Sequence, residues 1–245
     1  MISSPAGPAR AAWRPTTEGS CVKPVRYSPV RLRTDENPAG RPCADLHHYR
    51  ADLALLDHIR RDLRALLRRA RAGELVLRPY EVRNWEEDGL RRRIVMCDPA
   101  TLLKGTDVLI VGFLGNRRST PEAQAIDEFD IDVISEFRQY PGILSYSSTE
   151  RTPKQWANLV VHQEVGDREA WRHSAVHVEA AEVLSPVVYH NVRIHNGRLR
   201  GGPIGDGRVT VDVSKYWDYD SDPMWHAVRT LPGGITSAQP WPGRR

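Results

Sequence analysis

Secondary structure alternates in a defined order between residues 107 and 218, and this order limits the possible folds. The apolar and polar patterns predict a strand at 107–114, a helix at 120–137, strands at 143–150 and 156–164, a helix at 167–184, and strands at 188–195 and 209–218. The first strand is a continuous apolar run, and Pro121 suits the first turn of the helix that follows.

This order is that of the split βαβ or ferredoxin-like arrangement. The predicted strands 107–114 and 156–164 are apolar on both faces. A second layer must therefore cover the side of the sheet that the two helices leave open. A second subunit could supply that layer, and so could an N-terminal helix and hairpin.

The N-terminal part of the chain predicts such a helix and hairpin. Leucine and isoleucine recur at spacings of three and four between residues 46 and 72, and Gly73 is a stop signal. Two short β-prone runs, 74–83 and 91–97, are joined by a polar segment, which predicts a hairpin.

The two ends of the chain have a different composition. Residues 1–45 are rich in Pro, Gly, Ser and Arg and show no periodicity, and residues 231–245 have the same character. Such segments bury too little apolar surface to offset their conformational entropy. We therefore expect a disordered or extended tail at 1–45, a single α+β domain at 46–230 and a C-terminal tail at 231–245.

Charge and composition exclude several classes of partner. The formal net charge is +4, but the basic excess lies in residues 1–45 and in Arg244 and Arg245. We expect no nucleic-acid partner, because the body of the chain has no excess to neutralise phosphates. No apolar run is long enough to span a membrane, and the start of the chain lacks the core of a secretory signal. We expect a cytoplasmic protein with free cysteines and no membrane contact.

Three stretches of the chain point to a family. Residues 138–150 contain Pro141-Gly142 followed by an apolar strand, residues 156–161 continue it, and Trp171 leads into a helix with two histidines. This pattern resembles the antibiotic-biosynthesis monooxygenase-like group of the dimeric α/β-barrel superfamily, over about 107–218. The resemblance implies an α+β fold in which a ferredoxin-like βαββαβ core forms a dimeric α/β barrel, here with an extra N-terminal helix and hairpin.

The same resemblance implies a function class and a location for the site. Members of the group include cofactor-independent oxygenases that act on polycyclic phenols, while related barrels are cyclases, isomerases, haem-binding dehydratases and haem-degrading enzymes. Their substrates bind between the sheet and its helices, which would make Tyr146 and Trp171 substrate contacts. The implied assembly is a homodimer.

Two histidines occupy the predicted helix 167–184. At 100° per residue, His173 and His177 share a stripe with Ala180 and Ala181, so both imidazoles are expected on the buried face. They could act as general acids or bases, or they could be satisfied core histidines. A metal site is a third interpretation, although the glutamate of a His-Glu-x-x-His motif is absent.

The strand 156–164 offers further polar groups. Alternation places Trp156, Asn158 and His162 on one face, where they could orient a small molecule in an apolar pocket. A solvent-exposed His162 at the strand end is the competing interpretation.

The strand 188–195 carries two more candidates. Arg193 could hold a carboxylate or phenolate bidentately, with His195 beside it, although surface positions near a turn explain both residues equally well. The glycine-rich stretch 201–207 precedes a strand rather than a helix, so we interpret it as a loop that could close over a pocket.

Together these patterns predict a small-molecule enzyme of bacterial specialised metabolism. We expect a cofactor-independent monooxygenase that uses His173, His177 and His162 on an aromatic or polyketide-type substrate. The substrate would contact Trp156, Asn158, Tyr146, Trp171, Arg193 and His195. A non-oxidative cyclase or dehydratase, a haem- or metal-dependent enzyme, and a non-catalytic binding protein are the alternatives.

Overall fold

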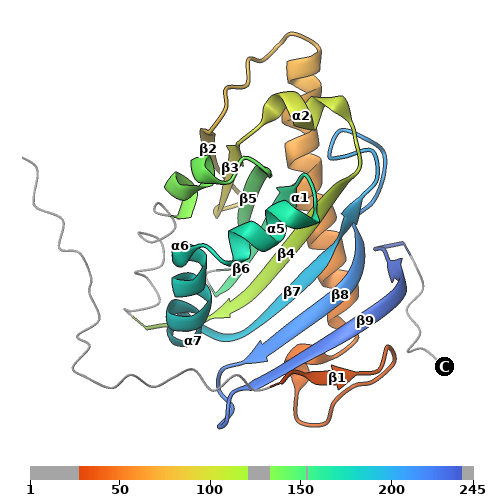
Figure 1. Ribbon diagram of the computed structural model, residues 1–245, viewed down its shortest axis with the longest axis vertical. Coiled ribbons are helices and arrows are strands. Elements are labelled where there is room, and N and C mark those ends of the chain that lie inside the picture. Colours follow the sequence, from red (N-terminus) through yellow and green to blue (C-terminus); the bar gives the residue numbers. More distant parts are fainter. Residues whose placement is uncertain (1–27, 121–132, 153, 239–245) are drawn as a thin grey trace, which may run out of the picture.

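One mixed nine-stranded sheet organises the protein (Figure 1). A computed structural model describes residues 28–120, 133–152 and 154–238. The strand order is β1-β9-β8-β7-β4-β6-β5-β3-β2, in which β1 pairs parallel to β9 and every other pairing is antiparallel. The strands are β1 (Val30–Leu32), β2 (Glu81–Glu87), β3 (Leu90–Met96), β4 (Val108–Arg117), β5 (Ile143–Thr152), β6 (Gln155–His162), β7 (Tyr189–Leu199), β8 (Thr210–Asp218) and β9 (Trp225–Ile235).

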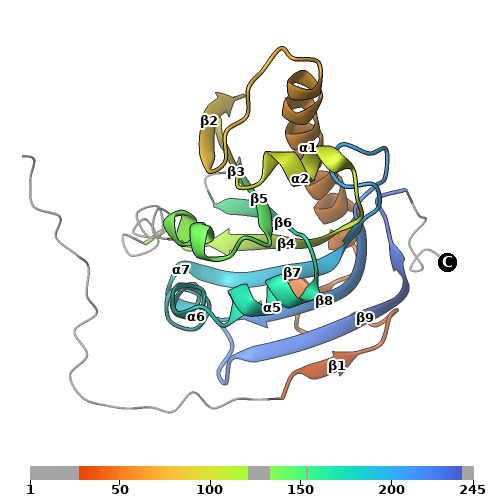
Figure 2. The same ribbon diagram turned by 45° about the horizontal axis from the view of Figure 1, so that its top comes forward.

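Helices lie on both faces of this sheet. The helical elements are η1 (Pro42–Ala44), α1 (His48–Arg71), α2 (Pro99–Lys104), η2 (Phe137–Gln139), α5 (Val165–Arg172), α6 (Ala175–Val178), the π-helix η3 (Glu179–Leu184) and α7 (Ser185–Val188). Figure 2 shows α1 on one side of the sheet and α5 to α7 on the other. We call these two sides the α1 face and the α5 face.

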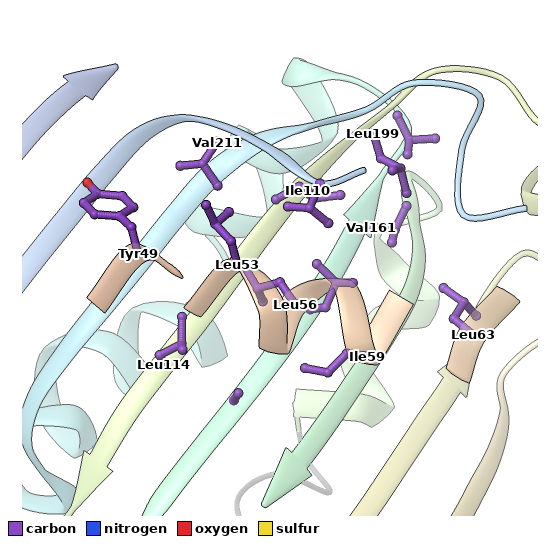
Figure 3. Close-up of a cluster of buried hydrophobic side chains, with 14 of the residues drawn as sticks. Tyr49, Leu53, Leu56, Ile59, Leu63, Ile110, Leu114, Val161, Leu199 and Val211 are labelled. Atoms are coloured by element: carbon purple, nitrogen blue, oxygen red, sulfur yellow. The ribbon is translucent and has the colours of Figure 1, made fainter. Parts of the chain in front are cut away.

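The long helix α1 forms the main core with the sheet (Figure 3). Its apolar stripe of Leu53, Leu56 and Leu63 is almost inaccessible to solvent. Gly112 on β4 makes the close approach possible, because a Cβ atom there would lie 2.5 Å from a methyl carbon of Leu56. The predicted N-terminal helix is therefore confirmed, and it supplies the layer that covers the α1 face.

The predicted ferredoxin-like core that forms a dimeric α/β barrel is wrong. The structure has a single nine-stranded sheet, to which the hairpin β2–β3 and the strands β8, β9 and β1 add edges on either side. A barrel dimer needs an open sheet face for the second subunit. Here α1 occupies that face: it contacts β5 and β6, and Leu56 lies against Gly112 of β4.

The predicted helix 167–184 is not continuous. α5 ends at Arg172, with His173 as its C-cap. Ser174 then begins α6 as an N-cap whose hydroxyl accepts a hydrogen bond from the His177 backbone N–H at 3.0 Å. The chain then passes through η3 into α7. The interruption changes the helical phase, so the predicted shared stripe of His173 and His177 is wrong.

Candidate functional site

Four of the predicted site residues come together on the α5 face. Tyr146 of β5 and Trp171 of α5 pack against Phe137, and His177 of α6 packs against Trp171. His162 of β6 lies close enough for the charge of His177 to affect it. Trp171 makes edge contacts with Phe137 at 5.2 Å and with His177 at 5.5 Å between ring centroids. Phe137 also contacts Tyr146 at 5.4 Å. The result is a ring-rich cluster that contains imidazole groups.

His162 ends β6 inside this cluster. Its side chain is 1% exposed, and within the described residues its Nδ1 has no hydrogen-bond partner. Burial, the positive charge of Arg168 and the neighbouring His177 lower the pKa of His162 to about 4. The imidazole is therefore neutral at pH 7, and its free nitrogen can accept or donate one hydrogen bond.

His177 has the same properties in a more accessible place. The Ser174 cap fixes the turn that brings its ring edge-on to Trp171. Burial and the charge of Arg172 lower the pKa of His177 to about 4, and its Nδ1 likewise lacks a partner in the described part of the chain. The side chain is half-buried.

A second pair of unsatisfied groups lies on the same face of the sheet. Ser148 of β5 is directly opposite Asn158 of β6. Neither Ser148 Oγ nor Asn158 Oδ1 has a hydrogen-bond partner among the described residues, although both atoms are buried. Buried polar atoms without partners are uncommon in folded proteins, so this face carries unused hydrogen-bonding capacity.

Trp156 is remote from the two histidines. It lies six residues before His162 on β6, which is about 20 Å along a strand. Its ring is flanked by the guanidinium groups of Arg91, at 5.6 Å, and Arg117, at 5.4 Å. The structure therefore does not gather Trp156 with the imidazole cluster.

His173 is also outside the cluster. Its side chain is exposed, and its Nδ1 lies 2.7 Å from the Glu169 backbone carbonyl in the last turn of α5. This contact helps to end the helix.

Arg193 and His195 lie on the opposite, α1 face, where they bind a carboxylate that the sequence analysis missed. Arg193 donates from Nε and Nη2 to the two oxygens of Asp52, at 2.6 and 2.8 Å. His195 donates from Nε2 to the same carboxylate at 3.1 Å, and its Nδ1 lies 2.8 Å from Ser214 Oγ. Burial alone would raise the pKa of Asp52, but the hydrogen bonds from His195 and Arg193 hold it well below its usual range.

The polar network continues toward the edge of the sheet. Tyr216 accepts a hydrogen bond from Arg229 Nη1 at 2.9 Å, and its hydroxyl lies 2.5 Å from that of Tyr49 on α1. Arg229 is fully buried and also donates to the backbone carbonyls of Glu36 and Ala44.

The two groups of polar residues differ in whether their hydrogen-bonding capacity is used. Asp52, Arg193 and His195 bind one another and attach α1 to the sheet. By contrast, His162 and His177 each keep a buried nitrogen without a partner in the described chain. The imidazole cluster is therefore the better candidate for ligand binding.

The described residues restrict the other chemistries. They contain no group of three or more His, Cys, Asp or Glu side chains arranged to hold a metal ion. Cys43 and Cys97 are buried free thiols, and burial raises their pKa values to about 11 and about 12, so neither is an activated nucleophile. None of the described helices has the length and apolar character needed to cross a membrane.

Comparison with known proteins leaves the family open. No protein-family model and no curated protein match the chain. A solved structure, that of protein SO0527 from Shewanella oneidensis, aligns with 38% of this chain and 91% of its own chain, at 9% sequence identity and a TM-score of 0.34. The resemblance to the monooxygenase-like group stays a prediction.

Proposed function

We propose that the protein is an enzyme that removes a proton from an aromatic or polyketide-type small molecule bound on the α5 face. His177 acts as the general base, and His162 hydrogen-bonds the oxygen of the substrate. The observation that carries this proposal is a pair of imidazoles, one buried and one half-buried, beside the rings of Trp171 and Tyr146. The Nδ1 atom of each is buried and has no partner in the described chain.

Electrostatics supports the role of the base. Both imidazoles are neutral at pH 7, since their pKa values lie at about 4, so His177 is ready to accept a proton. A pKa that low makes a weak base in the free protein. When the substrate becomes an anion beside His177, the opposite charge stabilises the imidazolium and raises its pKa. Proton transfer and substrate ionisation therefore favour each other.

The ring cluster supports the choice of substrate. Trp171, Phe137 and Tyr146 present faces and edges to which a planar aromatic molecule can pack. The unused polar atoms of Ser148 and Asn158 could hold its hydroxyl or carbonyl groups.

Dioxygen completes the proposed reaction. Loss of a proton from a methylene group conjugated with a phenol-type ring gives an electron-rich anion, which reduces dioxygen. One oxygen atom replaces the two methylene hydrogens as a carbonyl oxygen, and the other leaves as water. The substrate supplies all four electrons, so the balance needs no further reductant. Without dioxygen, the same base would promote ring closure or elimination.

The proposal extends to the oligomeric state, the cellular location and the cofactor content of the protein. We infer a cytoplasmic homodimer without a resident cofactor, in keeping with the free thiols of Cys43 and Cys97. Such a dimer would use a surface other than the α1 face. A mass of about twice 27.7 kDa in light scattering is expected, and the mass of one chain would refute the dimer. Haem absorption bands in the purified protein would refute the cofactor-free reaction.

Anthrone, a tricyclic carbon acid, is a suitable probe for the reaction. We expect the full chain to consume dioxygen with anthrone and the H177Q variant to be about 100-fold slower, as for loss of a general base. The H173Q variant is the matched control, because it alters an exposed imidazole of the adjacent turn. Equal rates for H177Q and the unaltered protein would refute the proposal.

A second readout separates the base from the oxygenation. Under argon in deuterated water, the base should exchange the methylene protons of anthrone even though no oxidation occurs. Exchange without dioxygen uptake would refute the oxygenase and retain the base. The absence of both would refute the enzyme proposal as a whole.

A further inference from the structure

A basic hollow lies away from the imidazole cluster, between the C-terminal half of α1 and the loop that joins β7 to β8. Figures 1 and 2 both show this loop beside α1 and α2. The hollow has a volume of about 490 Å³ and is lined by Arg64, Arg68, Arg71, Lys104, Gly105, Gly201, Ile204, Gly205 and Asp206. This volume lies within the range of sites that bind small molecules.

The cationic side chains reach the hollow from two helices. Arg64, Arg68 and Arg71 follow one another at spacings of four and three, which places them on the same side of α1. Lys104 comes from the last turn of α2. Arg64 is held in place, because its Nε donates to the Ile204 carbonyl at 3.2 Å.

Among the described residues that line the hollow, Asp206 is the one carboxylate. Asp206 accepts a hydrogen bond from Arg64 Nη2 and lies 3.8 Å from Arg68, although its own side chain is 94% exposed. Four cations and one carboxylate leave an excess of three positive charges. The net charge of the chain between its two ends is close to zero, so the overall composition does not reveal this local positive charge.

One of these cationic side chains binds a backbone carbonyl at the end of a described helix, but Arg68 does not. Arg71 donates to the Leu103 carbonyl at 2.5 Å and so satisfies the end of α2. The Arg68 side chain is 61% exposed, and its guanidinium group lies 3.8 Å from the exposed Asp206 carboxylate. Its guanidinium group can therefore turn toward a ligand.

The glycine-rich loop lets the backbone approach closely. Gly201 of this loop and Gly105, which caps the end of α2, have φ angles of 69° and 71°, which residues with a side chain rarely adopt. A Cβ atom on Gly205 would lie 2.6 Å from the Gly201 carbonyl oxygen. The loop is therefore folded tightly on itself and carries Asp206 at its exposed tip.

We propose that this hollow binds an organic diphosphate, such as a nucleoside diphosphate, through Arg64, Arg68, Arg71 and Lys104. A diphosphate ester carries about three negative charges at pH 7, which matches the excess in the hollow. Guanidinium groups bind phosphate oxygens bidentately, and Arg64 and Arg68 would exchange Asp206 for the ligand. Asp206 therefore competes with the ligand for the guanidinium groups of Arg64 and Arg68.

Titration calorimetry of the full chain with ADP tests the proposal, with AMP and inorganic pyrophosphate as further probes. ADP and pyrophosphate should bind more tightly than AMP, because AMP has one phosphate fewer. The R68Q variant should weaken ADP binding about tenfold. The R69Q variant is the matched control, since Arg69 lies on the same turn and pairs with Glu74 outside the hollow.

A variant with the opposite effect makes the test specific. D206N removes the competing carboxylate and should tighten ADP binding several-fold. The proposal is overturned if ADP and pyrophosphate do not bind, or if R68Q and R69Q weaken binding equally. Tighter binding of an oligonucleotide than of ADP at 0.15 M salt would also overturn it, because the hollow would then belong to an extended nucleic-acid surface.

Discussion

Asp52 on α1 and Arg193 on β7 form a bidentate ion pair, at 2.6 and 2.8 Å, between side chains that are almost inaccessible to solvent. The two residues are far apart in the sequence, so the pair forms only when α1 packs on the sheet. His195 binds the same carboxylate and completes its coordination. This pair therefore joins the N-terminal helix to the centre of the sheet.

Loss of this carboxylate should destabilise the protein. The D52N variant leaves the buried Arg193 charge without its partner, which costs about 3–5 kcal/mol in the free energy of unfolding. Urea denaturation followed by circular dichroism measures the change. As a control, D212N breaks the exposed pair with Arg198 and should cost at most about 1 kcal/mol. Equal losses in the two variants would show that the buried pair has no special role.

The imidazole cluster should make stability depend on pH. The folded pKa values of His162 and His177 are about 4, below the usual value of 6.5. Between these values the unfolded chain binds more protons, so stability is complete above about pH 6.5 and falls as the pH drops toward 4. The loss amounts to up to about 3 kcal/mol for each imidazole.

Denaturation midpoints between pH 4 and 7 test this linkage. The H162Q variant should have a smaller slope than the unaltered protein, because it removes one of the two imidazoles whose pKa is lowered by folding. A slope that does not change in H162Q would mean that His162 titrates normally.

The close approach of α1 to β4 should not tolerate a methyl group. In G112A, the new Cβ would lie 2.5 Å from Leu56, so the helix must shift or the leucine must leave its rotamer. We expect a loss of about 1–3 kcal/mol in urea denaturation. G166A in α5 is the control, because nothing lies within 4 Å of its Cβ position. A neutral G112A would contradict the tight helix–sheet contact.

Elements with a strong period were predicted well. The leucine stripe of α1 and the apolar run of β4 determine those elements locally. Strand β9 was missed because the alternation of Ala227, Arg229 and Leu231 includes an arginine, which normally indicates a solvent-exposed position. Arg229 is buried only because Tyr216 and backbone carbonyls from residues 36 and 44 accept its hydrogen bonds.

Two local signals were misread. The predicted helix 167–184 runs through Ser174, but the Ser174 hydroxyl starts a new helix as an N-cap. The dipeptide Asn196-Gly197 is common in hairpin turns, yet both residues continue β7 through a bulge. Gly197 is needed there because the Thr210 carbonyl oxygen would lie 1.9 Å from a Cβ atom. Contacts of this kind depend on strand register, which a single sequence does not reveal.

The sequence predicts only part of the candidate site, because contacts between distant elements are not encoded in local patterns. Local periodicity predicts His162 and His177 as site residues, the family resemblance implies Tyr146 and Trp171, and all four gather on the α5 face. The prediction that Arg193 lines the same pocket is wrong, because Arg193 binds Asp52 on the α1 face. An aspartate on the apolar stripe of a helix is a sequence signal for a buried cationic partner, but it does not identify which arginine.

Nitrogen-15 NMR of labelled histidine, recorded with and without anthrone under argon, tests the imidazole site most directly. We expect two imidazoles that stay neutral from pH 7 down to about 4 in the free protein, and whose nitrogen shifts change when anthrone is added. H162Q and H177Q assign the two signals. If both imidazoles titrate near pH 6.5 and do not respond to anthrone, the α5 face is not the ligand site.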